Sequence, residues 1–153
     1  MRVLQLCPKP PRPARDGGCL AMDAMTLGLL ADGHSVRVLA ISTEKHPNLP
    51  EHHDSHYRTA TQYHAVDVKT ALNHANALRH LIAGESYHIE RFHSPDFTRE
   101  LDKILRDEVF DVVILESLFM APYEQAIRRL SDARVVLRAH NVEHQIWQGL
   151  TQE

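Results

Sequence analysis

The sequence lacks the features that mark membrane, exported and nucleic-acid-binding proteins. No apolar run is long enough to span a bilayer, and the first residues reach Pro8 too soon for a signal peptide. Lys and Arg number 17 against 20 Asp and Glu, so the formal net charge is −3 and no basic field would concentrate nucleic acid or anionic lipid. Only two cysteines occur, Cys7 and Cys19, too few for a disulfide framework. We expect a cytoplasmic protein with reduced thiols and no nucleic-acid partner.

The remaining composition is that of a globular domain. With 153 residues, of which 43% are hydrophobic and 24% charged, the chain can bury one substantial core. We therefore expect one domain. Twelve histidines are many for this length, and the meaning of each cluster depends on its spacing.

Short apolar runs alternate along the chain with segments of helical periodicity. Gly33 stands where a left-handed helix end belongs, and Ser94-Pro95 is typical of a helix start. The prolines after Cys7 predict an extended loop, and residues 43–58 resemble a long surface loop. The patterns predict strands at 3–7, 36–41, 63–68, 87–92, 110–115 and 134–139, and helices at 19–32, 70–82, from 94 onward and at 122–130.

This alternation predicts an α/β fold with a doubly wound, mostly parallel, Rossmann-like sheet. Ligands of such sheets gather beyond the carboxyl ends of the strands. The loops that begin at Cys7, Glu116 and His140 should therefore share one edge. A further helical pattern starts at 142–147, shortly before Glu153, and we expect the chain to be a fragment of a longer protein.

Asp16-Gly17-Gly18 joins the first predicted strand to the first helix. Two glycines let the backbone approach a ligand closely, and the free N–H groups of a helix start favour an anion such as a diphosphate. The pair lacks the third glycine of a dinucleotide-binding fingerprint and the Gly-Lys-Ser/Thr of a Walker loop. Phosphate contact and a purely structural tight turn are both open. Cys19 follows at the same helix start, and we expect it to serve as a small helix residue rather than as a reactive thiol, because no basic partner can be assigned to it.

Two further candidate sites follow predicted strands. Glu116 offers a carboxylate for binding a hydroxyl or for catalysis, although with Ser117 it could equally begin a helix. His140 and Asn141 suit hydrogen bonding to sugar hydroxyls, or they brace the loop. His140 to His144 also matches the His-x-x-Glu-His pattern of inverted zinc peptidases, but a strand end rather than a helix interior disfavours that chemistry.

The segment from His52 to His56 holds three imidazoles and one carboxylate within five residues. A catalytic metal needs rigid ligands, which a proline-flanked loop does not provide. A solvated loop is the favoured interpretation, and we expect no metal.

Taken in order, these segments resemble the GT-B fold glycosyltransferases, in particular the retaining family 4 enzymes. The resemblance includes the opening strand, the proline-rich loop with Asp16-Gly17-Gly18, and the turn Gly33-His34-Ser35-Val36 before the second strand. It continues through Asp111 to Glu116 and through Arg138 to Glu143, and so covers the whole chain.

The resemblance implies an amino-terminal, acceptor-side domain spanning residues 1–153, with the nucleotide-sugar domain lying outside this chain. Gly17 and Gly18 would approach the donor diphosphate, Asp16 and Asn141 would contact the acceptor, and His140 and Glu116 are the catalytic candidates. Many family members carry a histidine where this sequence has Glu116. The implied reaction transfers a sugar from a nucleotide-diphosphate donor to a saccharide or lipid-linked acceptor, without a further cofactor. The fragment alone should be inactive, and the full-length enzyme could associate peripherally with membranes. A standalone module that binds a phosphorylated ligand without turnover is the alternative.

Overall fold

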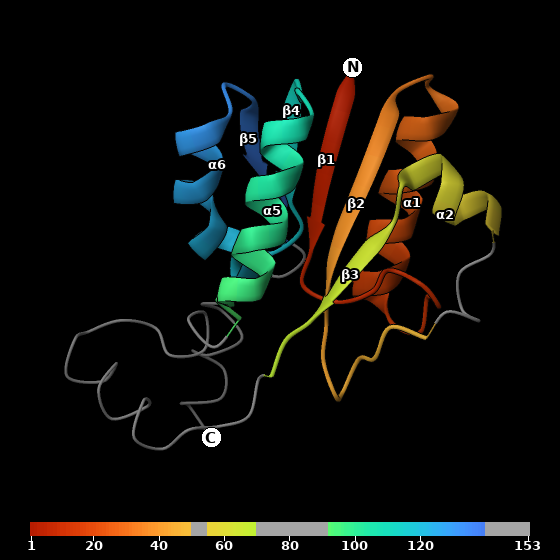
Figure 1. Cartoon of the computed structure of the whole chain (residues 1–153). Helices are drawn as coiled ribbons and strands as arrows, with labels where there is room; N and C mark the ends of the chain where they lie inside the picture. The colour runs from red at the N-terminus through yellow and green to blue at the C-terminus, as the bar shows by residue number, and fades with distance from the viewer. Residues whose placement is uncertain (50–54, 70–91, 140–153) are drawn as a thin grey trace, which may run out of the picture.

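A computed structural model describes residues 1–49, 55–69 and 92–139 (Figure 1). The element order within these ranges is β1 Arg2–Cys7, α1 Gly17–Ala31, β2 Ser35–Ser42, α2 Ser55–Thr61, β3 His64–Asp67, α5 Pro95–Asp107, β4 Val112–Leu115, the 3-10 helix η2 Leu118–Tyr123, α6 Glu124–Leu130 and β5 Arg134–Leu137.

The five strands form one parallel sheet in the order β3-β2-β1-β4-β5. The order reverses direction at β1, because the chain moves outward through β2 and β3 and then returns to place β4 on the other side. The carboxyl ends of the strands therefore lie together, along the lower edge in Figure 1. This arrangement confirms the predicted α/β, Rossmann-like, parallel fold.

Helices cover both faces of the sheet (Figure 1). On β1, Leu4 and Leu6 point to the face packed by α5 and α6, whereas Cys7 points to the face packed by α1. The same alternation on β2 sends Leu39 to the first core and Val38 to the second, as the two-residue period of a strand requires. All five side chains are fully buried, so the sheet is sandwiched between two apolar layers.

Helix α1 ends at the glycine that the sequence predicts, and it begins with an aspartate cap that was not predicted. Asp16 is extended and its side chain accepts a hydrogen bond from the Cys19 N–H over 2.9 Å, which caps the first turn. At the other end Gly33 has φ of +77°, and its N–H donates to the Leu30 carbonyl. The start at Gly17 lies two residues earlier than predicted, because the aspartate rather than the glycine pair ends the preceding loop.

The predicted helix start at Ser94-Pro95 is confirmed in α5. The Ser94 side chain accepts from the Phe97 N–H, and Phe97, Leu101 and Ile104 are buried at helical spacing. The predicted helix at 122–130 is confirmed for α6, but Pro122 lies within the preceding 3-10 helix.

The prediction that residues 43–58 form a surface loop is wrong at its carboxyl end, where α2 begins at Ser55. Tyr57 and Thr61 lie one turn apart and are both buried, and the Tyr57 ring lies 6.1 Å from that of Tyr63. Packing of these two buried side chains stabilises a helix that is too short to show periodicity in the sequence.

Several predicted elements lie outside the described residues. These are the helix at 70–82, the helical pattern at 142–147 and most of the strand at 87–92, of which Phe92 alone is described and lies in a turn. In the ranges that the structure does describe, no helix combines the length and apolar character needed to cross a membrane.

Candidate functional site

The carboxyl ends of β1 and β4 adjoin the point where the strand order reverses. Open α/β sheets bind ligands in the crevice at such a point, because the loops after the two strands diverge to opposite faces. In this protein the loop after β1 leads to α1 and the loop after β4 leads to η2, on opposite sides of the sheet. The topology therefore places a crevice between Gly17-Gly18 and Ser117.

A pocket of about 660 Å³, here called the larger pocket, lies at this crevice. Its volume is within the range of small-molecule sites. Both predicted glycines and Asp16 line it, so the structure brings together the sequence-predicted residues of the first loop. Its lining residues are Pro8, Lys9, Asp16, Gly17, Gly18, Ala21, Met22, His46, Phe92, Ser117 and Phe119.

Asp16 serves two structural purposes at the rim of this pocket. One carboxylate oxygen caps α1 through the Cys19 N–H, and the other lies 2.6 Å from Lys9 Nζ. The Lys9 hydrogen bond, with the Cys19 N–H next, lowers the pKa of Asp16 to about 2. The carboxylate therefore stays ionised at neutral pH and holds the Lys9 ammonium beside the helix start.

Gly18 is tightly enclosed, whereas Gly17 is not. A Cβ on Gly18 would lie 3.3 Å from Asp16 Oδ1 and 3.4 Å from Lys9 Nζ, while a Cβ on Gly17 would meet nothing within 4 Å. The N–H groups of both residues stand in the first turn of α1, where a helix supplies no acceptor of its own. Gly18 thus keeps a polar, cationic surface open to the pocket, which suits an anionic group.

Ser117 forms the opposite wall with an unusual backbone. Its φ of 127° and ψ of 156° lie in a region that is nearly exclusive to glycine, and its hydroxyl oxygen accepts from the Phe119 N–H. Nearby, the Phe92 and Phe119 rings lie 4.7 Å apart between centroids and give the pocket an apolar side. Strain of this kind is found at ligand sites, where a local conformation is held by its surroundings.

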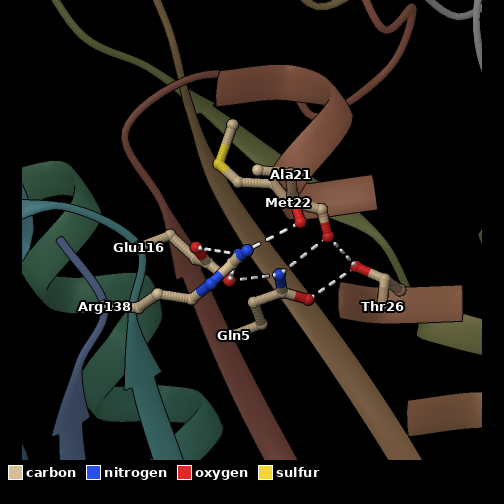
Figure 2. Close-up of polar contacts among 6 residues, drawn as sticks. All are labelled: Gln5, Ala21, Met22, Thr26, Glu116 and Arg138. Carbon is tan, nitrogen blue, oxygen red and sulfur yellow. Dashed lines mark hydrogen bonds and ion pairs between the residues drawn. The ribbon is translucent and has the colours of Figure 1, made fainter. Parts of the chain in front are cut away.

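A buried hydrogen-bond network lies under the larger pocket and begins at Gln5 in β1 (Figure 2). The Gln5 amide nitrogen donates to Glu116 Oε1 over 2.8 Å and to the Met22 carbonyl over 3.2 Å. Its amide oxygen accepts from the Thr26 hydroxyl over 2.6 Å. The opposite amide orientation would place Gln5 Oε1 against the Glu116 carboxylate, where two acceptors would face each other. The partners of the Gln5 amide therefore allow one orientation only.

Arg138 extends this network from the end of β5 to α1. One guanidinium nitrogen donates to Glu116 Oε2 over 2.9 Å and to the Ala21 carbonyl over 3.0 Å (Figure 2). Ala21 and Met22 line the larger pocket, so the network ties that wall to the ends of β1, β4 and β5.

The structure places Glu116 in this network and not in the pocket wall. Its side chain has no exposed surface, and its carboxylate accepts from Gln5 and Arg138. The expectation that Glu116 faces a ligand therefore needs correction: burial against a cation from the adjacent strand turns the side chain inward. Ser117, which caps η2, is the residue of this pair that reaches the pocket.

Other predicted site residues lie outside the described ranges. These are His140, Asn141, His52 and His53. His56, the last member of the histidine cluster, is exposed in the first turn of α2. Across residues 1–49, 55–69 and 92–139, no three His, Cys, Asp or Glu side chains converge as metal ligands do.

Neither cysteine is placed as a reactive thiol. Cys19 is only 4% exposed, its Sγ lies 3.5 Å from the Pro10 carbonyl oxygen, and burial raises its pKa. Cys7 is fully buried, and burial followed by the Glu116 charge raises its pKa well above the ordinary value. Both thiols therefore pack as small apolar residues.

Sequence reasoning missed Lys9 and His46, which both line the larger pocket. Lys9 follows β1 and His46 follows β2. Because ligands of parallel sheets bind beyond the carboxyl ends of the strands, the positions of these two residues were the signal that could have indicated them. His46 is held in a turn, because its N–H donates to the Thr43 carbonyl over 3.0 Å and its carbonyl accepts from the Thr43 N–H. Burial, followed by the charges of Lys9 and Lys45, lowers the pKa of His46.

No protein-family model matches the chain, and a search of curated proteins finds no significant match. The class of protein therefore rests on the fold and on the site. These define a Rossmann-like, parallel α/β structure with a candidate ligand pocket at the β1–β4 crevice.

Proposed function

We propose that this chain is the amino-terminal, acceptor-side domain of a GT-B glycosyltransferase. In this proposal a sugar passes from a nucleotide-diphosphate donor to a saccharide or lipid-linked acceptor, and the grip on the nucleotide comes from a second domain. The observation that carries the proposal is the position of Gly17 and Gly18, at the start of α1 and in the wall of the larger pocket.

The geometry supports contact with a diphosphate in three ways. First, the orphan N–H groups and the dipole of α1 favour negative charge at that spot. Second, Lys9 is fixed beside them by Asp16. Third, the absence of a Cβ on Gly18 leaves room next to the Lys9 ammonium, so a phosphate oxygen can approach both.

The rest of the pocket suits a neutral, partly apolar group such as a sugar ring. Phe92 and Phe119 supply an aromatic surface, and Ser117 and His46 supply polar groups at its edge. Asp16 would keep the acceptor-side role that the family resemblance implies, as an ionised rim carboxylate. With Glu116 buried, His140 remains the catalytic candidate of the pair that the resemblance suggested.

The test is a transfer assay on the enzyme as its gene encodes it, supplied with a panel of UDP-, GDP- and ADP-sugars. Gly18→Val should greatly reduce transfer, because a branched side chain fills the space for the diphosphate. Gly28→Val is the matched control, because Gly28 is exposed in the same helix and a Cβ there meets nothing within 4 Å. Undiminished transfer by a folded Gly18→Val enzyme would remove the phosphate role.

The same assay separates an enzyme from a binding module. Nucleotide release that depends on an acceptor supports transfer. Binding of a phosphorylated ligand with no turnover, for every donor tested, would favour the module and contradict the enzyme proposal.

A further inference from the structure

A second pocket, of about 190 Å³ and here called the smaller pocket, adjoins the larger one. The two share Asp16 and His46 in their walls, so they form adjacent lobes of one site. The smaller pocket is lined by Pro10, Arg12, Pro13, Arg15, Asp16, Cys19, Lys45, His46 and Pro47.

The charge of the smaller pocket differs from that of the whole chain. The formal net charge of the chain is −3, yet Arg12, Arg15 and Lys45 line this pocket against one carboxylate, that of Asp16. Asp16 is already paired with Lys9, a further cation at the boundary between the two lobes. Arg12 is itself paired with Asp23 on α1, so Arg15 and Lys45 carry the local excess of positive charge in this otherwise acidic protein.

The loop after β1 that carries this charge is held in a fixed shape. Arg12 Nε lies 2.7 Å from Asp23 Oδ1 on α1, and its guanidinium carbon lies 4.0 Å from the centroid of the Tyr57 ring. The Arg15 N–H donates to the Pro13 carbonyl over 2.8 Å. Prolines on both sides of Arg12 restrict the backbone further.

The turn after β2 that carries Lys45 and His46 is anchored as well. Thr43 closes it through hydrogen bonds in both directions with His46. The Asn48 N–H donates to Ser42 Oγ, and Asn48 Oδ1 accepts from the Tyr63 hydroxyl over 3.1 Å. Cations presented from anchored segments bind an anion at a smaller entropic cost than cations on free loops.

We propose that the smaller pocket is an oxyanion subsite, so that the acceptor of this enzyme carries a phosphate or carboxylate group. The acceptor's anionic group would contact Arg15 and Lys45, and its reacting part would extend past His46 into the larger pocket. This inference rests on the proposed glycosyltransferase function and adds the chemical class of the acceptor. It uses a place separate from the Gly17-Gly18 diphosphate position, since neither glycine lines the smaller pocket.

The field at His46 agrees with this assignment. The titratable and charged groups around it are Lys9 and Asp16 from the loop after β1 and Lys45 from its own turn. After burial, the two lysines are the main causes that lower the pKa of His46, and Asp16 opposes them. An oxyanion bound beside His46 would offset the charges of these two lysines.

The experiment titrates inorganic phosphate into the 153-residue chain, at constant ionic strength maintained with chloride, and follows backbone amide signals by NMR. The amides of Arg15, Lys45 and His46 should shift together. The double variant Arg15→Gln/Lys45→Gln should bind phosphate roughly tenfold more weakly. The matched control is Lys103→Gln/Arg106→Gln, two exposed cations on α5, and it should bind as the native chain does.

Each outcome decides the proposal. Saturable shifts that weaken only in the Arg15/Lys45 variant support the subsite, and acetate in place of phosphate tells whether a carboxylate is also accepted. No saturable shifts, equal weakening in the control variant, or unchanged affinity in the Arg15/Lys45 variant would overturn it. If the oxyanion subsite is refuted, the sugar transfer expected of the full-length enzyme and its expected decrease in Gly18→Val are unaffected. Failure of this inference is therefore distinguishable from failure of the proposed function.

Discussion

Replacing Thr26 with valine tests the buried network beneath the larger pocket. Valine has nearly the same shape as threonine, so the change leaves no cavity and removes only the hydroxyl that donates to Gln5 Oε1 over 2.6 Å. Gln5 and Thr26 are both fully buried, and the Gln5 oxygen would be left without a donor and without water. A buried acceptor orphaned in this way costs about 1–3 kcal/mol of the free energy of unfolding.

A double-mutant cycle with Gln5→Leu separates this cost from a general effect of valine in the helix. In the Gln5→Leu background the orphaned oxygen no longer exists. The Met22 carbonyl, 2.9 Å from the Thr26 hydroxyl, keeps its place in the helical ladder. Thr26→Val should therefore cost only a few tenths of a kcal/mol there, which gives a coupling energy of about 1–2 kcal/mol.

The assay is equilibrium unfolding in urea, followed by circular dichroism, with all four proteins at the same pH. The slope against urea should stay constant across the set, so that midpoint differences report stability alone. An equal cost of Thr26→Val in both backgrounds would refute the network, because it would show that the hydroxyl does not act through Gln5.

Three further predictions concern Asp16 at the rim of the site, the two cysteines, and Ser117. The ionised carboxylate of Asp16 has a depressed pKa in the folded chain, so it stabilises the fold above pH about 4 and loses this effect as pH falls toward 2. The stability difference between the native chain and Asp16→Asn should shrink over that range, and a difference independent of pH would contradict the Lys9 pairing. Cys7 and Cys19 should react slowly with iodoacetamide at pH 8 in the folded chain and quickly in urea, whereas fast labelling of folded Cys19 would show an accessible thiolate. Ser117→Gly should raise the unfolding free energy by about 1 kcal/mol because it relieves the positive φ, and a loss of stability would mean that the serine cap outweighs the strain.

Local signals in the sequence predicted much of the fold. The Ser94 cap, the left-handed Gly33 and the apolar strands act over a few residues, so their patterns are readable without tertiary contacts. The short helix α2 was not predicted, because only Tyr57 and Thr61 are buried in it and two positions are too few to show a helical periodicity.

The candidate site was only partly predictable, because some of its residues are positioned by contacts between segments far apart in the sequence. Gly17 and Gly18 were found because a loop between a strand and a helix is a local pattern. The pairing of Glu116 with Arg138 depends on β4 lying beside β5, and the buried Gln5 depends on α1 crossing β1. Those contacts exist only once the sheet order is known, so the sequence alone placed Glu116 in the pocket.

The most direct test of the central claim is an NMR titration of the 153-residue chain with inorganic pyrophosphate, which represents the diphosphate of the proposed donor. We predict saturable shifts of the Gly17 and Gly18 amides and of Ser117 across the crevice, with the amides at the opposite edge of the sheet unchanged. In Gly18→Val these shifts should disappear while the spectrum otherwise remains that of a folded chain. Pyrophosphate that leaves the Gly17 and Gly18 amides unmoved, or that moves them equally in Gly18→Val, would contradict a diphosphate site at the start of α1.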